Sequence, residues 1–251
     1  MRHPPLWRPD MRLSGPINGD LLHYRRNEDG PRLLDLGCGD GTRAIALASR
    51  AFNQVTALDA TESLIELAQR RAAKRRAAVT FVCGDPWATP FMAAQFDEVM
   101  LLGDLFGHSS SLKSDVDLLR EARRVLQVGG RLHLSFSDGD WIRRHFSSKA
   151  VEGLPTGFIY RRRSLSADGH SMRTTILSSG DDYGIARQSC ISEWLYTPRD
   201  VTEVLHLLGF EAIVYDDASQ EARSRLTPDI PRFVVHCRAG RPSAVLRTVG
   251  Q

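Results

Sequence analysis

The feature that most constrains this chain is the stretch over residues 33–42, LLDLGCGDGT. A short apolar run ends there in three glycines on alternate positions, Gly37, Gly39 and Gly41, and a segment of helical composition follows over residues 42–52. Glycine is needed where a turn takes backbone angles that a Cβ forbids, and where a ligand lies against bare backbone. We therefore predict a strand, a tight turn and a helix whose first amides point at a ligand, as at the first crossover of a doubly wound sheet.

The acids around this turn distinguish it from a dinucleotide site. The pattern G-x-G-x-x-G needs glycine at its sixth place, where this chain has Thr42. Asp35 and Asp40 add negative charge, which suits a cation or an amino group better than a pyrophosphate. An ordinary strand-to-helix turn is the alternative. The string resembles the first motif of class I S-adenosylmethionine-dependent methyltransferases, whose ligand carries an ammonium and a sulfonium and no phosphate.

Two further strands of the predicted sheet also end in acids. Residues 54–59, QVTALD, form the second strand, and Asp59 stands about 20 residues beyond the glycines, where doubly wound folds bind ribose hydroxyls. Residues 79–83 form the third strand, and Asp85 follows it. The resemblance implies that Asp85 accepts from the adenine amino group and that Pro86 or Trp87 lies beside the base; Asp85 also suits a helix N-cap. The expected cofactor-binding set is Asp35, Gly37, Cys38, Gly39, Asp59, Ala60, Asp85, Pro86, Trp87 and Gly103.

The remaining core segments continue the alternation of strand and helix. Residues 96–102 and 131–136 read as the fourth and fifth strands, with a helix capped by Ser114 between them and Gly129–Gly130 ending that helix. Parallel strands joined by right-handed crossovers are the expected topology. Later apolar runs resemble the sixth strand and the antiparallel seventh strand of the family. The fold class is therefore α/β: a doubly wound, seven-stranded, mostly parallel sheet of the Rossmann-like methyltransferase type.

Residues 138–196 break this rhythm. Three segments alternate polar and apolar residues and are separated by turn sequences, which indicates an inserted antiparallel meander. We expect this insertion to close the ligand end of the sheet as a substrate lid. The predicted organisation is an N-terminal lid segment over residues 1–30, the core over 31–137 and 197–238, and the inserted lid over 138–196.

The loop after the fourth strand is expected to face the reacting methyl group, because ligands of open α/β sheets lie outside the carboxyl ends of the strands. His108 in this loop is the best-placed candidate base, and Asp104 is a candidate for orienting an amine or holding the cofactor. A loop histidine satisfied by backbone is the alternative for His108. Candidate substrate-binding residues are Tyr24, His145, Tyr160, Arg162 and Tyr183.

Composition narrows the class of protein. The chain has 251 residues, is 42% hydrophobic and 25% charged, and carries a net charge of +3, which is ordinary for a globular protein and too small to indicate nucleic acid. Its four cysteines show no C-x-x-C spacing, so neither a disulfide framework nor a metal site is expected. No stretch reads as a signal peptide or membrane span. We expect a cytoplasmic protein; the oligomeric state is not indicated.

These features together predict a methyltransferase that moves a methyl group from S-adenosylmethionine to an oxygen or nitrogen atom of a small molecule. An RNA methyltransferase that uses the basic end of the helix over residues 61–77 and Arg161–Arg163 is one alternative. A non-methylating enzyme, or a binding protein, that keeps S-adenosylmethionine as its ligand is the other. The fourth loop lacks the [DN]-P-P-[YF] sequence of base-amine methylases and a nucleophilic cysteine, and a nucleic-acid partner is not expected.

Overall fold

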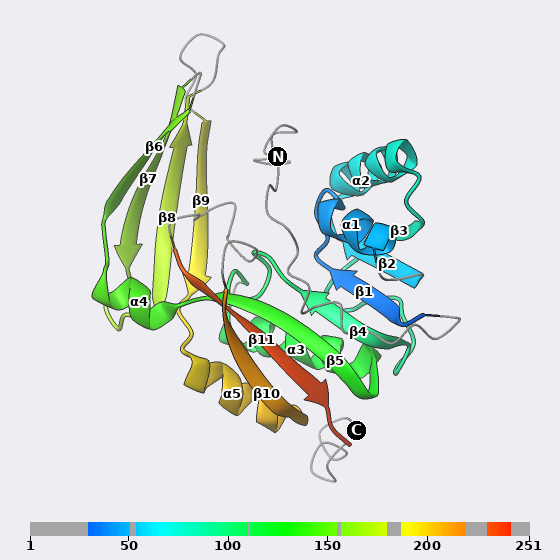
Figure 1. Ribbon diagram of the computed structural model, residues 1–251. Coiled ribbons are helices and arrows are strands. Elements are labelled where there is room, and N and C mark those ends of the chain that lie inside the picture. Colours follow the sequence, from blue (N-terminus) through cyan, green and yellow to red (C-terminus); the bar gives the residue numbers. More distant parts are fainter. Residues whose placement is uncertain are drawn as a thin grey trace.

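The computed structural model describes residues 30–50, 54–109, 111–154, 157–179, 187–218 and 230–241 (Figure 1). Tyr24 and Tyr183, both candidate substrate-binding residues, and the expected N-terminal lid segment lie outside these residues. The described strands form two sheets, one with seven strands and one with four. None of the described helices combines the length and the apolar character that a membrane crossing requires.

The larger sheet has the predicted doubly wound order, β10-β11-β5-β4-β1-β2-β3. Its strands are β1 (Arg32–Leu36), β2 (Gln54–Asp59), β3 (Val79–Cys83), β4 (Phe96–Leu101), β5 (Leu126–Ser137), β10 (Phe210–Ala218) and β11 (Arg232–Ala239). The first five strands pair in parallel, whereas β11 runs antiparallel to both β5 and β10. Because the carboxyl ends of parallel strands meet at one edge, the loops after β1, β2, β3 and β4 converge there.

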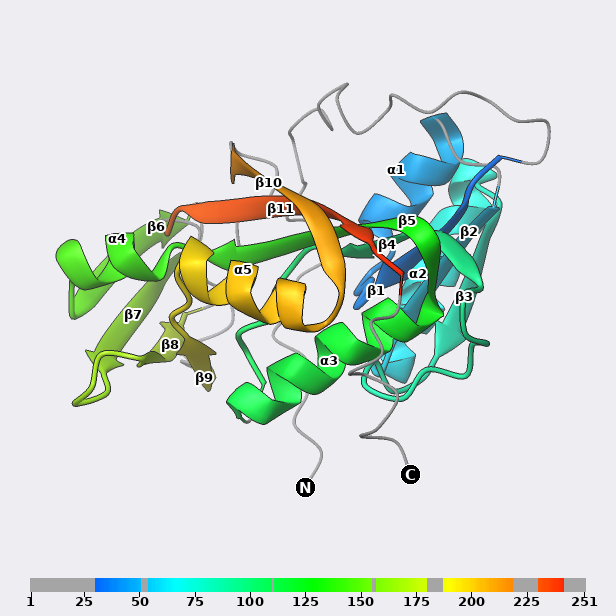
Figure 2. The same cartoon turned by 90° about the horizontal axis from the view of Figure 1, so that it is seen from below.

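Helices cover both faces of this sheet (Figure 2). They are α1 (Thr42–Arg50), α2 (Glu62–Arg75), α3 (Leu112–Val125) and α5 (Pro198–Leu207). Side chains alternate along a strand, so Leu33 of β1 joins a core cluster with residues of α1 and α2, while Leu34 and Leu36 join the cluster of α3 and α5. The apolar run that opens the glycine motif is thus buried on both sides, as parallel sheets require.

Two predicted helix boundaries are corrected by the structure. The N-cap of α3 is Ser111, whose hydroxyl accepts from the Ser114 amide at 3.1 Å, so Ser114 lies inside the first turn. Gly129 and Gly130 do not end this helix but lie in β5, which begins directly after it at Leu126. A Cβ on Gly130 would lie 2.9 Å from one carbonyl oxygen and 3.0 Å from another, so the glycine permits close strand contact rather than a helix stop.

The insertion between β5 and α5 forms the second sheet, which stands beside the core in Figure 1. It contains α4 (Gly139–Arg144) and the antiparallel strands β6 (Lys149–Leu154), β7 (Gly157–Leu165), β8 (Ser171–Ser178) and β9 (Arg187–Trp194) in sequential order. The meander was expected with three strands, and β6 and α4 were missed. Where the chain enters and leaves, the Gly139 amide donates to the Tyr196 carbonyl at 3.0 Å.

Candidate functional site

The glycine turn after β1 is fastened to the tip of β2. The amides of Gly37 and Cys38 donate to the Leu58 carbonyl at 2.9 and 3.0 Å. The Gly39 amide donates to Oδ2 of Asp59 at 2.9 Å, while Oδ1 accepts from the Thr61 amide at 2.9 Å. One carboxylate therefore joins the turn to the start of α2. Each of its oxygens has a second lone pair for a further donor.

Two glycines of the turn have different physical requirements. Both have positive φ, +74° at Gly41 and +55° at Gly39. A Cβ on Gly41 would lie 2.6 Å from Ala68 Cβ and 2.9 Å from the Phe81 ring, so this position is closed by packing. At Gly39 no described residue comes within 4 Å of such a Cβ. Gly41 therefore holds the turn against α2 and β3, whereas Gly39 exposes bare backbone to a ligand.

The acids of the motif are both engaged by arginines. Asp35 is fully buried, and its Oδ1 accepts from Arg43 at 2.7 Å. Burial raises the pKa of Asp35 against the opposing effect of Arg43. Its Oδ2 has no hydrogen-bond partner among the described residues. Asp40 pairs with Arg71 of α2 and accepts from the Thr42 amide. The negative charge expected at the turn is thus balanced in part, with one buried oxygen left over.

The loop after β3 places its candidate residues in different surroundings. Asp85 is exposed and accepts from the Trp87 amide at 2.9 Å, but it lies in a turn and among the described residues no helix follows it directly, so the alternative of a helix N-cap is wrong. Trp87 is half-buried against the α3 side of the core, and its indole donates to the Ser114 carbonyl at 2.8 Å. Pro86 is buried and Ala60, beyond the tip of β2, is exposed. Asp85 and Ala60 therefore offer accessible surface at neighbouring strand tips.

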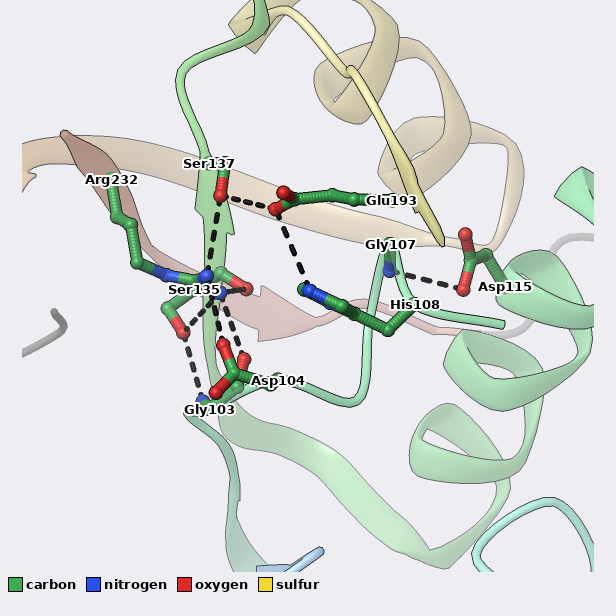
Figure 3. A network of polar contacts seen from close by, with 9 residues as sticks. All are labelled: Gly103, Asp104, Gly107, His108, Asp115, Ser135, Ser137, Glu193 and Arg232. Atoms are coloured by element: carbon green, nitrogen blue, oxygen red, sulfur yellow. Dashed lines mark hydrogen bonds and ion pairs between the residues drawn. The ribbon is translucent and has the colours of Figure 1, made fainter. Parts of the chain in front are cut away.

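The loop after β4 is held by Arg232, the first residue of β11 (Figure 3). The side chain of Arg232 is 1% exposed and donates to the Gly103 carbonyl at 2.8 Å and to Oδ1 of Asp104 at 3.2 Å. The Gly103 amide donates to the Ser135 hydroxyl at 3.0 Å. Arg232 of β11 thus fixes both candidate residues of this loop, Gly103 and Asp104. Because these residues lie about 130 positions earlier in the chain, no local sequence signal could reveal the contact.

His108 lies in the same region, buried beside Glu193 of β9 (Figure 3). Its Nε2 is 3.8 Å from Oε1 of Glu193, and neither ring nitrogen has a hydrogen-bond partner among the described residues. The alternative of a histidine satisfied by backbone therefore finds no support in these residues. Ser137 of β5 donates to Glu193 and lies 3.3 Å from Arg232. The structure thus brings together His108, Asp104 and two residues that the sequence analysis missed, Glu193 and Arg232.

The inserted sheet has a buried face and an exposed face, and the candidates Tyr160 and Arg162 lie on the exposed one. Paired residues of neighbouring antiparallel strands point to the same side, so the register places Arg161, Arg163 and Glu193 on one face. These three are buried, whereas Arg162 is exposed on the opposite face, which Tyr160 shares. The substrate-binding role of Arg162 and Tyr160 therefore stays a prediction. His145 is exposed at the end of α4 and stacks on Trp141.

Comparisons with known proteins agree with this geometry. Residues 33–130 match the family model described as "Methyltransferase domain". The 27-O-demethylrifamycin SV methyltransferase of Amycolatopsis mediterranei (strain S699) is 37% identical over 107 residues, 42% of this chain and 38% of that protein. The ubiquinone/menaquinone biosynthesis C-methyltransferase UbiE of Paracoccus denitrificans (strain Pd 1222) is 38% identical over 115 residues, 45% of this chain and 44% of that protein. The chain therefore matches less than half the length of either curated relative.

A solved structure extends the likeness over most of the chain. The S-adenosylmethionine-dependent methyltransferase from Clostridium acetobutylicum ATCC 824 superposes with a TM-score of 0.68, at 14% identity, covering 83% of this chain and 84% of that one. At this identity the likeness concerns the fold. The predicted fold class and the resemblance of the glycine turn to class I methyltransferases are both confirmed.

Proposed function

We propose that this chain, whose residues 33–130 form a methyltransferase domain on a class I fold, transfers a methyl group from S-adenosylmethionine to an oxygen or nitrogen atom of a small molecule. One observation carries the proposal. The Asp59 carboxylate at the tip of β2 holds the Gly39 and Thr61 amides, each at 2.9 Å, beside backbone that no described side chain covers. That geometry suits a ribose whose two hydroxyls donate to one carboxylate.

The other residues of the turn fit the remaining parts of this cofactor. The buried, unpartnered Oδ2 of Asp35 is an acceptor that suits an ammonium group, since a buried polar atom without a hydrogen bond is costly. A Cβ on Gly103 would also meet no described residue within 4 Å, which leaves room beside the loop after β4. Asp85 and Ala60 are the accessible groups for the base, with Gly37, Cys38, Pro86 and Trp87 shaping the loops around them.

The chemistry asks little of the protein beyond placement and proton removal. The bound sulfonium supplies a methyl group that is already activated. The chain must hold the acceptor atom in line with it, which contributes several kcal/mol in well-oriented reactions, roughly 7–11 at most. His108 and Asp104 lie in the loop where the acceptor is expected. In this role His108 takes the proton of a hydroxyl or amine, and Asp104, oriented by Arg232, accepts a hydrogen bond from the substrate.

A small-molecule acceptor is supported by the names of the two curated relatives, a rifamycin O-methyltransferase and a quinone C-methyltransferase. The basic residues that suggested RNA are partly engaged: Arg71 pairs with Asp40 and Arg161 with Glu152. We propose a small-molecule partner on these grounds. We also propose a cytoplasmic setting, because all four cysteines are free thiols, as is usual in a reducing compartment.

Calorimetric titration with S-adenosylmethionine tests the proposal. We expect saturable binding by the wild type and at least about tenfold weaker binding by Asp59→Ala, equal to about 1.4 kcal/mol. Glu62→Ala is the matched control, because it removes one exposed negative charge near the same loop without touching the turn. An Asp59→Ala affinity equal to that of the control removes Asp59 from the ribose role. Absence of binding by the wild type contradicts the proposed function.

A further inference from the structure

Glu193 of β9 is a buried carboxylate that the proposed reaction does not yet use. Its side chain is 3% exposed, although it comes from the inserted sheet rather than from the core. Its Oε1 accepts from the Ser137 hydroxyl, and Oε2 has no hydrogen-bond partner among the described residues. A buried carboxylate held in one orientation needs a physical reason, because burial of charge is expensive unless it is paired.

His108 is the group that Glu193 faces. The side chain of His108 is 9% exposed, and the ion pair between Nε2 and Oε1 of Glu193 spans 3.8 Å. Nδ1 is the other ring nitrogen and has no described partner. An imidazole whose Nε2 points at a carboxylate has its Nδ1 on the far side of the ring. The spatial order is therefore the Glu193 carboxylate, then Nε2 of His108 and then Nδ1 of the same ring.

The backbone keeps this arrangement in place. The Trp194 amide of β9 donates to the Gly107 carbonyl at 2.7 Å, so the residue after Glu193 is bonded to the residue before His108. On the other side, Asp115 of α3 accepts from the Gly107 amide at 3.1 Å. Glu193 is itself braced by Ser137, which Arg232 approaches to 3.3 Å. The carboxylate and the ring are thus anchored by separate elements that meet at this point (Figure 3).

We propose that Glu193 is a positioning residue for His108. The carboxylate is the hydrogen-bond acceptor for Nε2–H and so holds the ring in the Nε2–H tautomer, with the Nδ1 lone pair directed at the substrate. The separation of 3.8 Å exceeds a hydrogen bond by about 1 Å, as is common for catalytic contacts in proteins without substrate. At this distance the negative charge of the carboxylate already favours the proton on Nε2 in the ligand-free protein. The inference rests on the proposed function, in which His108 acts as the base.

The resulting proton transfer balances without another reactant. The acceptor O–H or N–H gives its proton to Nδ1 of His108, and the acceptor's electron pair forms the new bond to the methyl carbon. The C–S bond breaks, and its electron pair stays on the sulfur as a neutral thioether. Glu193 accepts no proton in this step; it stabilises the imidazolium that forms, as the carboxylate of a catalytic triad does.

Nuclear magnetic resonance of the histidine rings tests this directly and needs no substrate. Long-range proton–nitrogen correlation spectra of nitrogen-15-labelled full chain distinguish the two tautomers at about pH 8.5, above the ordinary imidazole pKa near 6.5. The spectrum of His108→Gln identifies the His108 signals by their loss. We expect Nε2–H to dominate in the wild type and to give way to a mixture with Nδ1–H in Glu193→Leu. Ser192→Ala, an exposed neighbour on the same strand, should leave the signals unchanged.

Glu193→Gln guards against misfolding of the leucine variant, since the amide keeps the shape and can still accept from Ser137. It should reduce the share of Nε2–H less than Glu193→Leu does. A wild-type ring in the Nδ1–H form, or an unchanged Nε2–H share in both folded variants, overturns the proposal. Because these spectra are recorded without S-adenosylmethionine, a failure here is distinguishable from a failure of the calorimetric test of the proposed function.

Discussion

The two halves of the proposed site, a cofactor side and an acceptor side, are built in different ways. On the cofactor side, the turn after β1 is held by groups close in sequence: backbone amides, the Asp59 carboxylate and a pair between Asp35 and Arg43. On the acceptor side, His108 and Asp104 are placed by Glu193 and Arg232, which come from the inserted sheet and the last strand. The first half is a local structure, and the second depends on the whole fold.

This difference has a chemical consequence. In the proposed site, backbone amides and the acid at the tip of β2 bind the cofactor. This cofactor is the same whatever substrate is methylated. The acceptor side draws on the insertion, so its chemistry can change without altering the turn. Variants of the first half should therefore affect the stability of the fold or cofactor affinity, and variants of the second should affect turnover.

The largest difference between the effect on turnover and the effect on cofactor affinity is expected from His108→Ala. Loss of a general base lowers turnover by about 100-fold or more, while the affinity for S-adenosylmethionine, measured by calorimetry, should remain close to that of the wild type. Turnover is followed as methyl transfer to an acceptor found by screening hydroxyl- and amine-bearing small molecules. Glu193→Leu should approach the same loss, and the double variant should lose no more than His108→Ala, because the two residues act as a unit. Equal losses of turnover and affinity would assign His108 a structural role.

The next largest effect is expected inside the glycine turn. Gly41→Ala forces a Cβ into 2.6 Å contact with Ala68 Cβ at positive φ, and we expect about 3 kcal/mol loss in the free energy of unfolding. Gly39→Ala meets no described side chain; about 1 kcal/mol is expected from the backbone alone, together with weaker cofactor binding. Urea unfolding and calorimetry on both variants measure this. A reversed order of stability would mean that the turn is not packed against α2 as described.

Asp115 gives the acceptor side a pH dependence of its own. Burial, the largest effect, raises the pKa of Asp115, which accepts from Gly107 and Tyr196. An acid with a raised pKa in the folded state contributes stability below its unfolded pKa and loses that contribution as pH rises through the folded pKa. Removing the acid with Asp115→Asn should therefore help more at higher pH.

The quantity to measure is the unfolding free energy of Asp115→Asn minus that of the wild type, followed upward from about pH 4, near the ordinary Asp pKa. It should rise by up to about 1.4 kcal/mol per pH unit within that window. Asp117→Asn is the control on the same helix: Lys113 lowers the pKa of Asp117, so its difference should change only below about pH 4 and stay flat in the window above it. A flat difference for Asp115→Asn would mean that burial does not perturb this acid.

The smallest effect concerns the two faces of the inserted sheet. Arg161→Ala breaks the pair between the buried Arg161 and the partly exposed Glu152 at 3.0 Å, and a loss of about 1 kcal/mol in unfolding free energy is expected. Arg162→Ala, one position along on the exposed face, should stay within about 0.5 kcal/mol. Thermal unfolding measures both. Equal effects would contradict the register of β7.

The sequence predicted what local chemistry determines. Gly39, Gly41 and Asp59 carry their requirements in their own backbone geometry and spacing, and the alternation of strand and helix predicts a doubly wound, mostly parallel sheet. The capping box that opens α5 is equally local, because the Thr197 side chain accepts from the Asp200 amide and the Asp200 side chain accepts from the Thr197 amide. In contrast, Gly129 and Gly130 resemble a helix stop in sequence but lie in β5, and Gly130 is needed there because of close carbonyls that include that of Asp97 in β4.

The sequence did not predict Glu193 and Arg232 on the acceptor side, because their roles also depend on contacts with distant parts of the chain. Glu193 and Arg232 are ordinary residues of alternating strands, and nothing in their neighbours separates them from a solvated glutamate or an edge arginine. Their roles arise from contacts between distant parts of the chain: Glu193 lies 85 positions after His108, and Arg232 lies 128 positions after Asp104. The alternation of β7 likewise defines two faces but not which one is buried, and the structure places Arg161 and Arg163 on the buried face and Arg162 on the exposed one.

The contact between Gly139 and Tyr196 has an evolutionary consequence. A Cβ on Gly139 would lie 2.6 Å from the Tyr196 carbonyl oxygen, so the entering and leaving chains touch at one point. Segments whose ends meet are the ones that proteins gain, lose and exchange most readily. The 55 or so residues between these positions form a cassette, and grafting another cassette at the same junction is a route by which an ancestral enzyme of this kind acquires a new acceptor while keeping its source of methyl groups.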